Sequence, residues 1–310
     1  MHSRETRALE ISRRRSPKIW VTSKPSSSTL VVCRAMALSL QSRVTLNDGT
    51  KMPVLGLGVW QAAAGKETRK AVAYALETGY RLIDTAKLYG NERDVGIAVR
   101  ESGIPREEIF VTTKLWNSDH GYESALRAFQ ESRRELGLEY VDLYLIHWPV
   151  PGLRQESWKA LLKLRDQGEV RSIGLSNYVI PHLEELLPTS PMPPSVNQVE
   201  FHPFLFQKEL LEYCRAHRIQ LEAYSPLARG QRLKHPVIRE VAAKYGRTPA
   251  QVLIRWSLQH GLVVIPKSVR PERIRENADV FGFELKAADM TRLDALDERS
   301  HLAWNPEDLP

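Results

Sequence analysis

The chain has 310 residues, of which 42% are hydrophobic and 26% are charged. This composition excludes a disordered or fibrous chain and is typical of a globular protein with a large core. No apolar run approaches the length of a membrane span. The two cysteines, Cys33 and Cys214, are too few for a disulfide framework and indicate a reducing compartment.

Most of the net charge of +7 lies at the N-terminus, where residues 1–35 hold eight basic residues against two acidic ones. The rest of the chain is nearly neutral, so we expect no nucleic-acid partner. The leader is rich in Arg and Ser, which is the composition of an organellar transit peptide. We favour the other interpretation, a misassigned upstream start or a disordered tail, because the sequence from Met36 looks like a natural start. We expect one folded domain over 36–310, in the cytoplasm, or in an organelle if the leader is a targeting segment.

The folded part begins with a predicted β-hairpin over 44–55, because Asn47-Asp48-Gly49 stands between apolar flanks. Eight short runs rich in Val, Ile and Leu follow, each too short for a typical helix and typical of a parallel strand covered on both faces. They are LGLGVW (55–60), RLIDTA (81–86), IFVTTKLW (109–116), VDLYLIHW (141–148), VRSIGLSN (170–177), SVNQVEF (195–201), QLEAYSPL (220–227) and LVVIPK (262–267).

Amphipathic segments such as 121–137 and 155–168 separate these runs and predict helices. Gly103, Gly137 and Gly168 stand where a glycine would end a helix, and Thr248-Pro249 resembles a helix start. Eight strand and helix units over about 270 residues predict an eight-stranded (β/α)8 TIM barrel preceded by the hairpin. A doubly wound sheet gives the same alternation and stays open at this point.

Polar residues gather at the ends of the predicted strands, where a barrel carries its chemistry. Asp84, Lys114 and His147 end the second, third and fourth runs, and Tyr89 follows the second. Singly, each has an ordinary explanation, such as a turn cap or a solvated lysine. Together they predict a site, in which Asp84 and Lys114 pair and the ammonium lies near the Tyr89 hydroxyl. A nearby cation would lower the tyrosine pKa from about 10 and make Tyr89 a usable general acid.

The chain resembles the aldo-keto reductase superfamily over nearly everything after Met36, in particular its small bacterial and protozoan-type carbonyl reductases. The resemblance is carried by DTAKLYGNE, TTKLWN, LYLIHWP, GLSNY, NQVEFHP, AYSPL and IPKSVRPERIREN, in that order. It implies an NADPH-dependent reductase of small aldehydes and ketones, such as 2-oxoaldehydes or keto sugars. In such an enzyme the nicotinamide gives a hydride and Tyr89 a proton, while His147 orients the carbonyl oxygen.

The resemblance also implies the roles of individual residues. Asp84, Tyr89, Lys114 and His147 match a complete catalytic tetrad. The remaining matches imply contacts with the cofactor: Ser176, Asn177 and Gln198 with the carboxamide, Tyr224 with the nicotinamide ring, Ser225 and Leu227 with the pyrophosphate, Lys267, Ser268 and Arg273 with the 2′-phosphate, and Glu276 and Asn277 with the adenine.

The residues themselves favour the phosphate assignment. Lys267 ends a strand, and Arg273 falls in the first turn of a helix that begins near Pro271. Two cations and a helix N-terminus converge there, which is a favourable site for a phosphate. Gly56 and Gly58 lack the third glycine of the Rossmann fingerprint and are expected to allow close packing instead.

Short loops after the fourth and seventh strands predict an open substrate site with Trp60, Trp116 and Trp148 as apolar walls, beside His147. The loop at Ala228-Arg229-Gly230 departs from the usual cover over the pyrophosphate. No metal-ligand spacing is present, so we expect no metal, and we expect a monomer that acts on small molecules. An NADPH-sensing barrel with incidental turnover is the main alternative function, and a metal-dependent barrel hydrolase is a more distant one.

Overall fold

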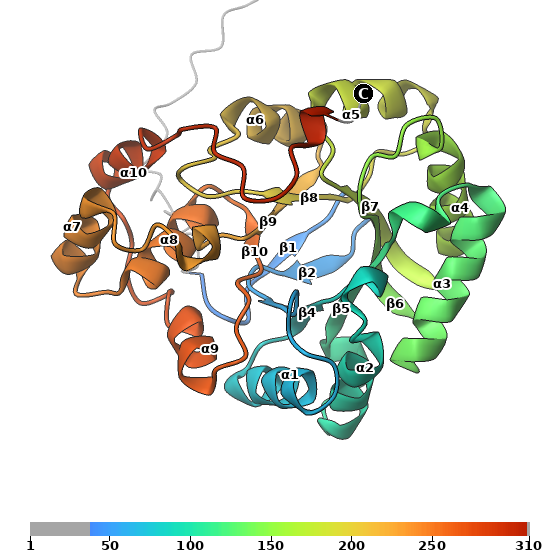
Figure 1. The fold of residues 1–310 in the computed structure, drawn as a ribbon, viewed down its shortest axis with the longest axis horizontal. Helices are drawn as coiled ribbons and strands as arrows, with labels where there is room; N and C mark the ends of the chain where they lie inside the picture. Colours follow the sequence, from blue (N-terminus) through green and yellow to red (C-terminus); the bar gives the residue numbers. More distant parts are fainter. Residues whose placement is uncertain (1–37, 309–310) are drawn as a thin grey trace, which may run out of the picture. The chain divides into compact units, whose positions relative to one another are not determined.

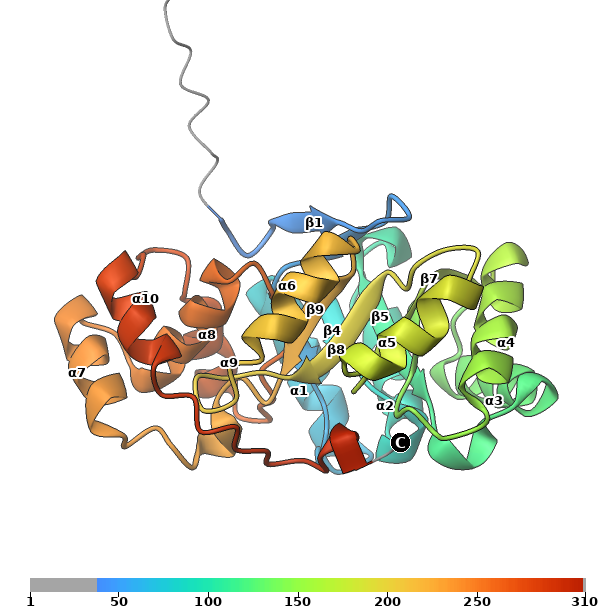
Figure 2. The same cartoon turned by 90° about the horizontal axis from the view of Figure 1, so that it is seen from above.

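The structure, a computed structural model, describes residues 38–308 and opens with the expected hairpin. Strand β1 (Arg43–Thr45) pairs antiparallel with β2 (Lys51–Pro53). The turn is fixed to the barrel, since Asn47 Nδ2 donates to the Pro194 carbonyl at 2.9 Å and Ser195 Oγ donates to Asp48 at 2.7 Å. Ser195 directly precedes a barrel strand, so the hairpin covers the N-terminal ends of the strands (Figure 2). Expectations about residues 1–35 lie outside the described residues.

Eight parallel strands form the barrel (Figure 1). They are β3 (Leu57–Gly58), β4 (Leu82–Asp84), β5 (Phe110–Leu115), β6 (Val141–Ile146), β7 (Val170–Ser176), β8 (Val196–Glu200), β9 (Gln220–Tyr224) and β10 (Val263–Val264). Each pairs with the next in sequence, and bridges from Leu55 to Val264 and from Gly58 to Lys267 join the first strand region to the last. The barrel prediction is confirmed, and the doubly wound alternative is excluded because the sheet closes.

Helices cover the outside of the barrel (Figure 1). They are α1 (Lys66–Thr78), α2 (Glu92–Glu101), α3 (Tyr122–Leu136), α4 (Arg154–Asp166), α5 (Ile180–Leu186), α6 (Lys208–Ala216), α7 (Pro236–Tyr245), α8 (Pro249–Gln259), α9 (Pro271–Ala278) and α10 (Ala287–Asp294). The predicted boundaries hold at two caps: Thr248 Oγ accepts the Gln251 N–H at 3.2 Å, and Gly137 ends α3 at φ 61°. Helices α7 and α10 are additions that pack together beside the barrel.

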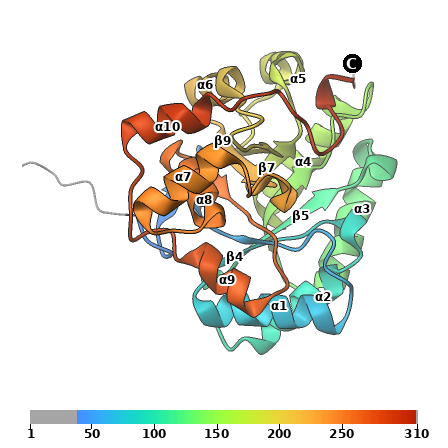
Figure 3. The same ribbon diagram turned by 60° about the vertical axis from the view of Figure 1, so that its left-hand side comes forward.

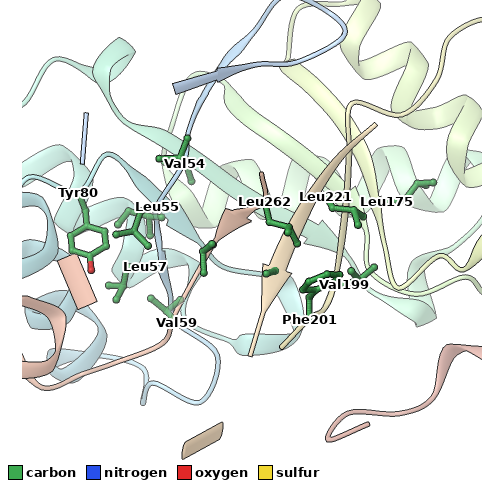
Figure 4. Close-up of a cluster of buried hydrophobic side chains, with 14 of the residues drawn as sticks. Val54, Leu55, Leu57, Val59, Tyr80, Leu175, Val199, Phe201, Leu221 and Leu262 are labelled. Atoms are coloured by element: carbon green, nitrogen blue, oxygen red, sulfur yellow. The ribbon is translucent and has the colours of Figure 1, made fainter. Parts of the chain in front are cut away.

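Two apolar cores hold the strands in place. The larger one lies between the strands and the helices, and Figure 4 shows part of it, including Leu57, Leu175 and Leu221. The smaller one includes Leu82 and Phe110 and is joined by residues of the hairpin region. Burying a side chain of this size contributes about 1.5–3 kcal/mol, so these layers hold the ends of the strands in fixed positions.

The first strand packs closely enough to need glycine. A Cβ atom at Gly56 would lie 2.4 Å from the Leu82 side chain, and one at Gly58 would lie 3.0 Å from the Ile265 carbonyl oxygen. The prediction that these glycines allow close packing is therefore confirmed.

The described residues belong to one compact unit. After α10 the chain runs on to a short 3₁₀ helix, Pro306–Asp308, which lies near α5 (Figures 1 and 3). Within residues 38–308, no helix combines the length and the apolar character that crossing a membrane requires.

Candidate active site

An ion pair lies at the C-terminal end of the barrel strands. Asp84 ends β4 and Lys114 lies on β5, and both side chains are buried. Lys114 Nζ donates to the two Asp84 carboxylate oxygens at 2.7 and 2.8 Å and to the Thr85 carbonyl at 2.9 Å. The opposite charges offset the cost of burial for both groups, as the sequence predicted.

Tyr89 ends a 3₁₀ helix (Lys87–Tyr89) after β4, and its hydroxyl oxygen accepts a hydrogen bond from Lys114 Nζ at 3.3 Å. Burial, and next the charges of Asp84 and Glu222, raise the pKa of Tyr89 well above 10. The expectation that Lys114 would lower this pKa is wrong, because burial and the two carboxylate charges together determine the direction of the shift. Tyr89 therefore stays protonated throughout the neutral range.

His147 follows β6 and lies beside Tyr89, with 5.8 Å between the ring centroids. The Trp116 ring packs edge-on against its other side, at 5.2 Å. Burial, and then the charge of Lys114, lower the pKa of His147 well below 6.5, so the imidazole is neutral. Its buried Nδ1 has no hydrogen-bond partner among the described residues. A neutral imidazole next to a phenol can orient a carbonyl oxygen by a hydrogen bond, with no change in its own charge.

The strand ends from β7 to β9 form a hydrogen-bonded wall. Tyr224 Oη donates to Asn177 Oδ1 at 2.8 Å, and Asn177 Nδ2 donates to the His147 carbonyl at 2.9 Å and to Ser176 Oγ at 3.0 Å. Asn177 adopts a left-handed backbone at φ 64°, a conformation that costs energy in most residues but that asparagine tolerates. These bonds fix the Tyr224 ring and the Asn177 amide relative to His147.

Gln198, on β8, reaches the ion pair as well. Its Nε2 donates to Asp84 Oδ2 at 2.7 Å and to Glu222 Oε2 at 2.9 Å. Both hydrogens of the amide are thus used within the floor of the site, which leaves the amide oxygen as the free group.

One cavity of about 1090 Å³ joins these residues to the basic helix start predicted for phosphate. Helix α9 begins at Pro271 as expected, and Arg273 lies in its first turn. Lys267 Nζ donates to the Gln61 carbonyl at 3.3 Å, and Ser268 Oγ contacts the Arg270 carbonyl at 3.4 Å. All predicted cofactor and substrate residues line this cavity: Ser176, Asn177, Gln198, Tyr224, Ser225, Leu227, Lys267, Ser268, Arg273, Glu276, Asn277, Trp60, Trp116 and Trp148.

The aromatic wall contains a residue that the sequence reasoning missed. Trp60 packs against Tyr89, with ring centroids 4.8 Å apart and the ring planes tilted by 53°. Trp304, in the C-terminal segment, lies 6.4 Å from Trp116 and 5.4 Å from Trp148. Nothing local in the sequence connects Trp304 to the barrel mouth.

Glu222 and Arg229 were also missed. Glu222 stands two positions before Tyr224, and the two-residue period of a strand could have placed both on the inner face. Arg229 lines the cavity and lies in the Ala228-Arg229-Gly230 loop, where its backbone is in the left-handed region at φ 51°.

Among residues 38–308, no three His, Cys, Asp or Glu side chains gather in a metal-binding arrangement.

Comparisons with known proteins show what the chain as a whole is similar to. Residues 54–298 match the model of the aldo/keto reductase family. A glyoxal reductase of Bacillus subtilis is 50% identical over 274 residues, which cover 88% of this chain and 99% of the relative. A 9,11-endoperoxide prostaglandin H2 reductase of Trypanosoma cruzi is 51% identical over 269 residues, covering 86% and 95%. A crystal structure of a Gox0644 mutant in complex with NADPH superposes with a TM-score of 0.82 at 46% identity, covering 86% of this chain and 98% of the other.

Proposed function

The chain belongs to the aldo/keto reductase family, and on this premise we propose that it reduces small aldehydes and ketones with NADPH, 2-oxoaldehydes and keto sugars among them. The observation that carries the proposal is the position of Lys114 Nζ, which contacts both Asp84 and the Tyr89 hydroxyl. Asp84 and Tyr89 line a cavity that continues to Lys267 and Arg273, and the buried Lys114 contacts both of them.

Tyr89 acts as the proton donor. Its oxygen accepts a hydrogen bond from Lys114, so its own hydrogen is free to point toward a carbonyl oxygen in the cavity. As the proton leaves, the developing phenolate lies 3.3 Å from an ammonium group. A charge fixed where negative charge develops stabilises the transition state without reorganisation. Asp84 holds Lys114 in place for this task.

His147 orients the carbonyl oxygen. It stays neutral, because burial and Lys114 lower its pKa, and its ring is held between Tyr89 and Trp116. A neutral imidazole can donate one hydrogen bond to the oxygen that Tyr89 protonates, which fixes the direction of approach.

The residues of the cavity fit NADPH. One end offers the Asn177 and Gln198 amides and the Tyr224 ring, and the other end offers Lys267 and Arg273 at the start of α9. Two cations and a helix N-terminus suit a phosphate, whereas amides and an aromatic face suit a nicotinamide. When bound, NADPH supplies the hydride that reduces the carbonyl carbon. A known structure in the same family contains this cofactor.

The walls favour small, partly apolar substrates. Trp60 is 40% exposed, so the cavity is open at this side. The relatives named as reductases of glyoxal and of a prostaglandin endoperoxide show that similar proteins act on different compounds. We therefore propose the class of substrate and not one compound.

The test is NADPH oxidation with purified protein over aldehydes, 2-oxoaldehydes, keto sugars and quinones. We expect turnover with several small aldehydes or 2-oxoaldehydes. Tight NADPH binding without turnover on any carbonyl would favour the alternative of an NADPH-sensing barrel. Absence of NADPH binding would overturn the cofactor assignment as well.

We also propose that the domain over 36–310 works as a monomer in a reducing compartment, the cytoplasm or an organelle if residues 1–35 direct it there. Gel filtration tests the first statement. Comparing the cellular location of the full chain with that of a chain starting at Met36 tests the second.

A further inference from the structure

A second buried carboxyl group acts on the charge of the proton donor, and the family assignment gives it no task. Glu222, on β9, is fully buried and stands level with Gln198 in the parallel ladder of β8 and β9. Gln198 Nε2 bridges Glu222 Oε2 and Asp84 Oδ2, at 2.9 and 2.7 Å. The other oxygen, Glu222 Oε1, is buried without a hydrogen-bond partner among the described residues.

Within residues 38–308, the groups that act on the charge of Glu222 include one cation, Lys114. Asp84 on β4 and Lys114 on β5 act on its charge, and Gln198 on β8 donates to it. On the β10 side its neighbour in the ladder is Val263, which is apolar. Two ionised carboxylates would thus share one ammonium that already pairs with Asp84. Burial, and next the charge of Asp84, raise the pKa of Glu222 to about 8.

We propose that Glu222 is a positioning residue of the reductase: as a neutral carboxyl it keeps the floor of the site uncharged overall, and its ionisation opposes proton release from Tyr89. The inference rests on the proposed function, since it assumes that Tyr89 is the proton donor. In the step concerned, the Tyr89 O–H bond breaks and an O–H bond forms on the substrate. Glu222 neither gives nor takes that proton.

Electrostatics gives the direction of the effect. A negative charge on Glu222 raises the pKa of Tyr89, because the phenolate would form close to another anion. Lys114 offsets one negative charge, that of Asp84, and has no second charge to give. The reduction should therefore slow as the pH rises through the ionisation of Glu222, although Tyr89 itself remains protonated.

The experiment is Glu222→Gln, which keeps the shape and the bond to Gln198 but cannot ionise in this range. In the native enzyme we expect kcat for aldehyde reduction to fall as the pH rises through about 8. The variant should lack this fall and exceed the native kcat about threefold to tenfold at alkaline pH, as expected if one added charge weakens Tyr89 as an acid by one pKa unit or less. If kcat of the variant falls at alkaline pH as kcat of the native enzyme does, the proposal is overturned.

Glu92→Gln is the matched control. Glu92 is also buried, accepts a hydroxyl hydrogen bond from Thr113 at 2.5 Å, and has a raised pKa, but its charge is not among those that raise the pKa of Tyr89. In the Glu92→Gln variant, kcat should still fall as the pH rises through about 8, as in the native enzyme. If the fall of kcat at alkaline pH is lost in both variants, any buried carboxyl group affects the pH profile, and the proposal is overturned as well.

A stability measurement tests whether Glu222 is neutral in the folded protein, and it requires no enzyme activity. The folded pKa of Glu222 lies above its ordinary value of 4.5, so the neutral group's contribution to stability is complete below about 4.5 and is lost as the pH rises to about 8. The native Tm should therefore fall relative to that of Glu222→Gln over this interval. If the two Tm curves run parallel, Glu222 is not neutral and the proposal fails, whether or not the protein reduces carbonyls. Should Glu222→Gln not fold, Glu222→Met provides the same two comparisons.

Discussion

Glu200 and Leu302 lie 102 positions apart in the chain, yet the Leu302 N–H donates to both carboxylate oxygens of Glu200, at 3.1 and 3.0 Å. The N–H of Ala303 donates to the same carboxylate at 3.0 Å. Because Glu200 is buried at the end of β8, these bonds fix the C-terminal segment at the barrel mouth. They hold Trp304 over Trp148 and so complete the aromatic wall.

Trp304→Ala should affect large substrates most. An aromatic contact contributes about 0.5–1.5 kcal/mol beyond area burial, so KM for an aromatic aldehyde should rise about twofold to tenfold. KM for a 2-oxoaldehyde too small to span the wall should change much less. Steady-state kinetics with both substrates checks this, and Glu200→Gln should shift KM in the same direction by loosening the segment. An equal rise for both substrates would show that Trp304 does not select by size.

Tyr89→Phe should bind NADPH as the native protein does but lose kcat by roughly two orders of magnitude or more, because a positioned general acid contributes about that much. The phenyl ring keeps the packing against Trp60, so the fold should be unaffected. Fluorescence titration gives the cofactor affinity, and single-turnover kinetics gives the rate of the chemical step. Reduction at the native rate by this variant would remove Tyr89 from the role of donor.

The barrel could be predicted from the sequence because its signals are local. Each strand is a short apolar run, and closure brings strand ends such as Asp84 and Lys114 to one mouth whatever the details of packing. Helix boundaries at Thr248 and Gly137 follow from cap chemistry within a few residues. The contacts among Asp84, Lys114 and Tyr89 and the start of α9 at Pro271 were predictable for the same reason, helped by the family resemblance. The roles assigned to these residues stay predictions.

What could not be predicted depends on contacts distant in sequence. Trp304 reaches the cavity only because Glu200 captures the backbone of the C-terminal segment, and no sequence period encodes that bond. The predicted direction of the shift in the Tyr89 pKa was wrong for a similar reason. The sequence suggested one cation beside the phenol, whereas in the structure burial, and next the charges of Asp84 and Glu222, raise this pKa.

His147 should remain neutral at acidic pH. Its folded pKa lies well below 6.5, because burial and then Lys114 disfavour the imidazolium. This group's contribution to stability is therefore present above about pH 6.5 and is lost as the pH falls through the folded pKa. NMR signals of the His147 ring, assigned with a His147→Gln variant, should not titrate near pH 6.5. A titration there would mean that the imidazole is solvated and charged when the reaction begins.

Gly96→Ala should destabilise the fold without touching the site. A Cβ atom at Gly96, in α2, would lie 1.7 Å from the Leu136 carbonyl oxygen at the end of α3, so the two helices would have to separate. Overpacking of this kind costs about 1–3 kcal/mol or more in the free energy of unfolding. Urea denaturation measures it. Gly282→Ala is the control, because its nearest neighbour is the movable end of Arg247 at 3.2 Å. Equal losses in the two variants would refute the role of the backbone contact.

Removing Arg273 should separate the two nicotinamide cofactors, which differ only by the 2′-phosphate. Charge-assisted hydrogen bonds contribute about 1.5–3 kcal/mol each, and exposure and salt reduce this value. Arg273→Ala should therefore weaken NADPH binding by about one to two orders of magnitude and change NADH binding little. Arg275→Ala is the matched control on the same helix, since Arg275 donates to the Tyr74 hydroxyl at 2.5 Å and does not line the cavity.

Added salt should reduce the NADPH preference of the native protein more than that of Arg273→Ala, because screening weakens the contact that the mutation removes. If Arg273→Ala weakens both cofactors equally, the residue contacts the part they share, and the phosphate site lies elsewhere in the cavity.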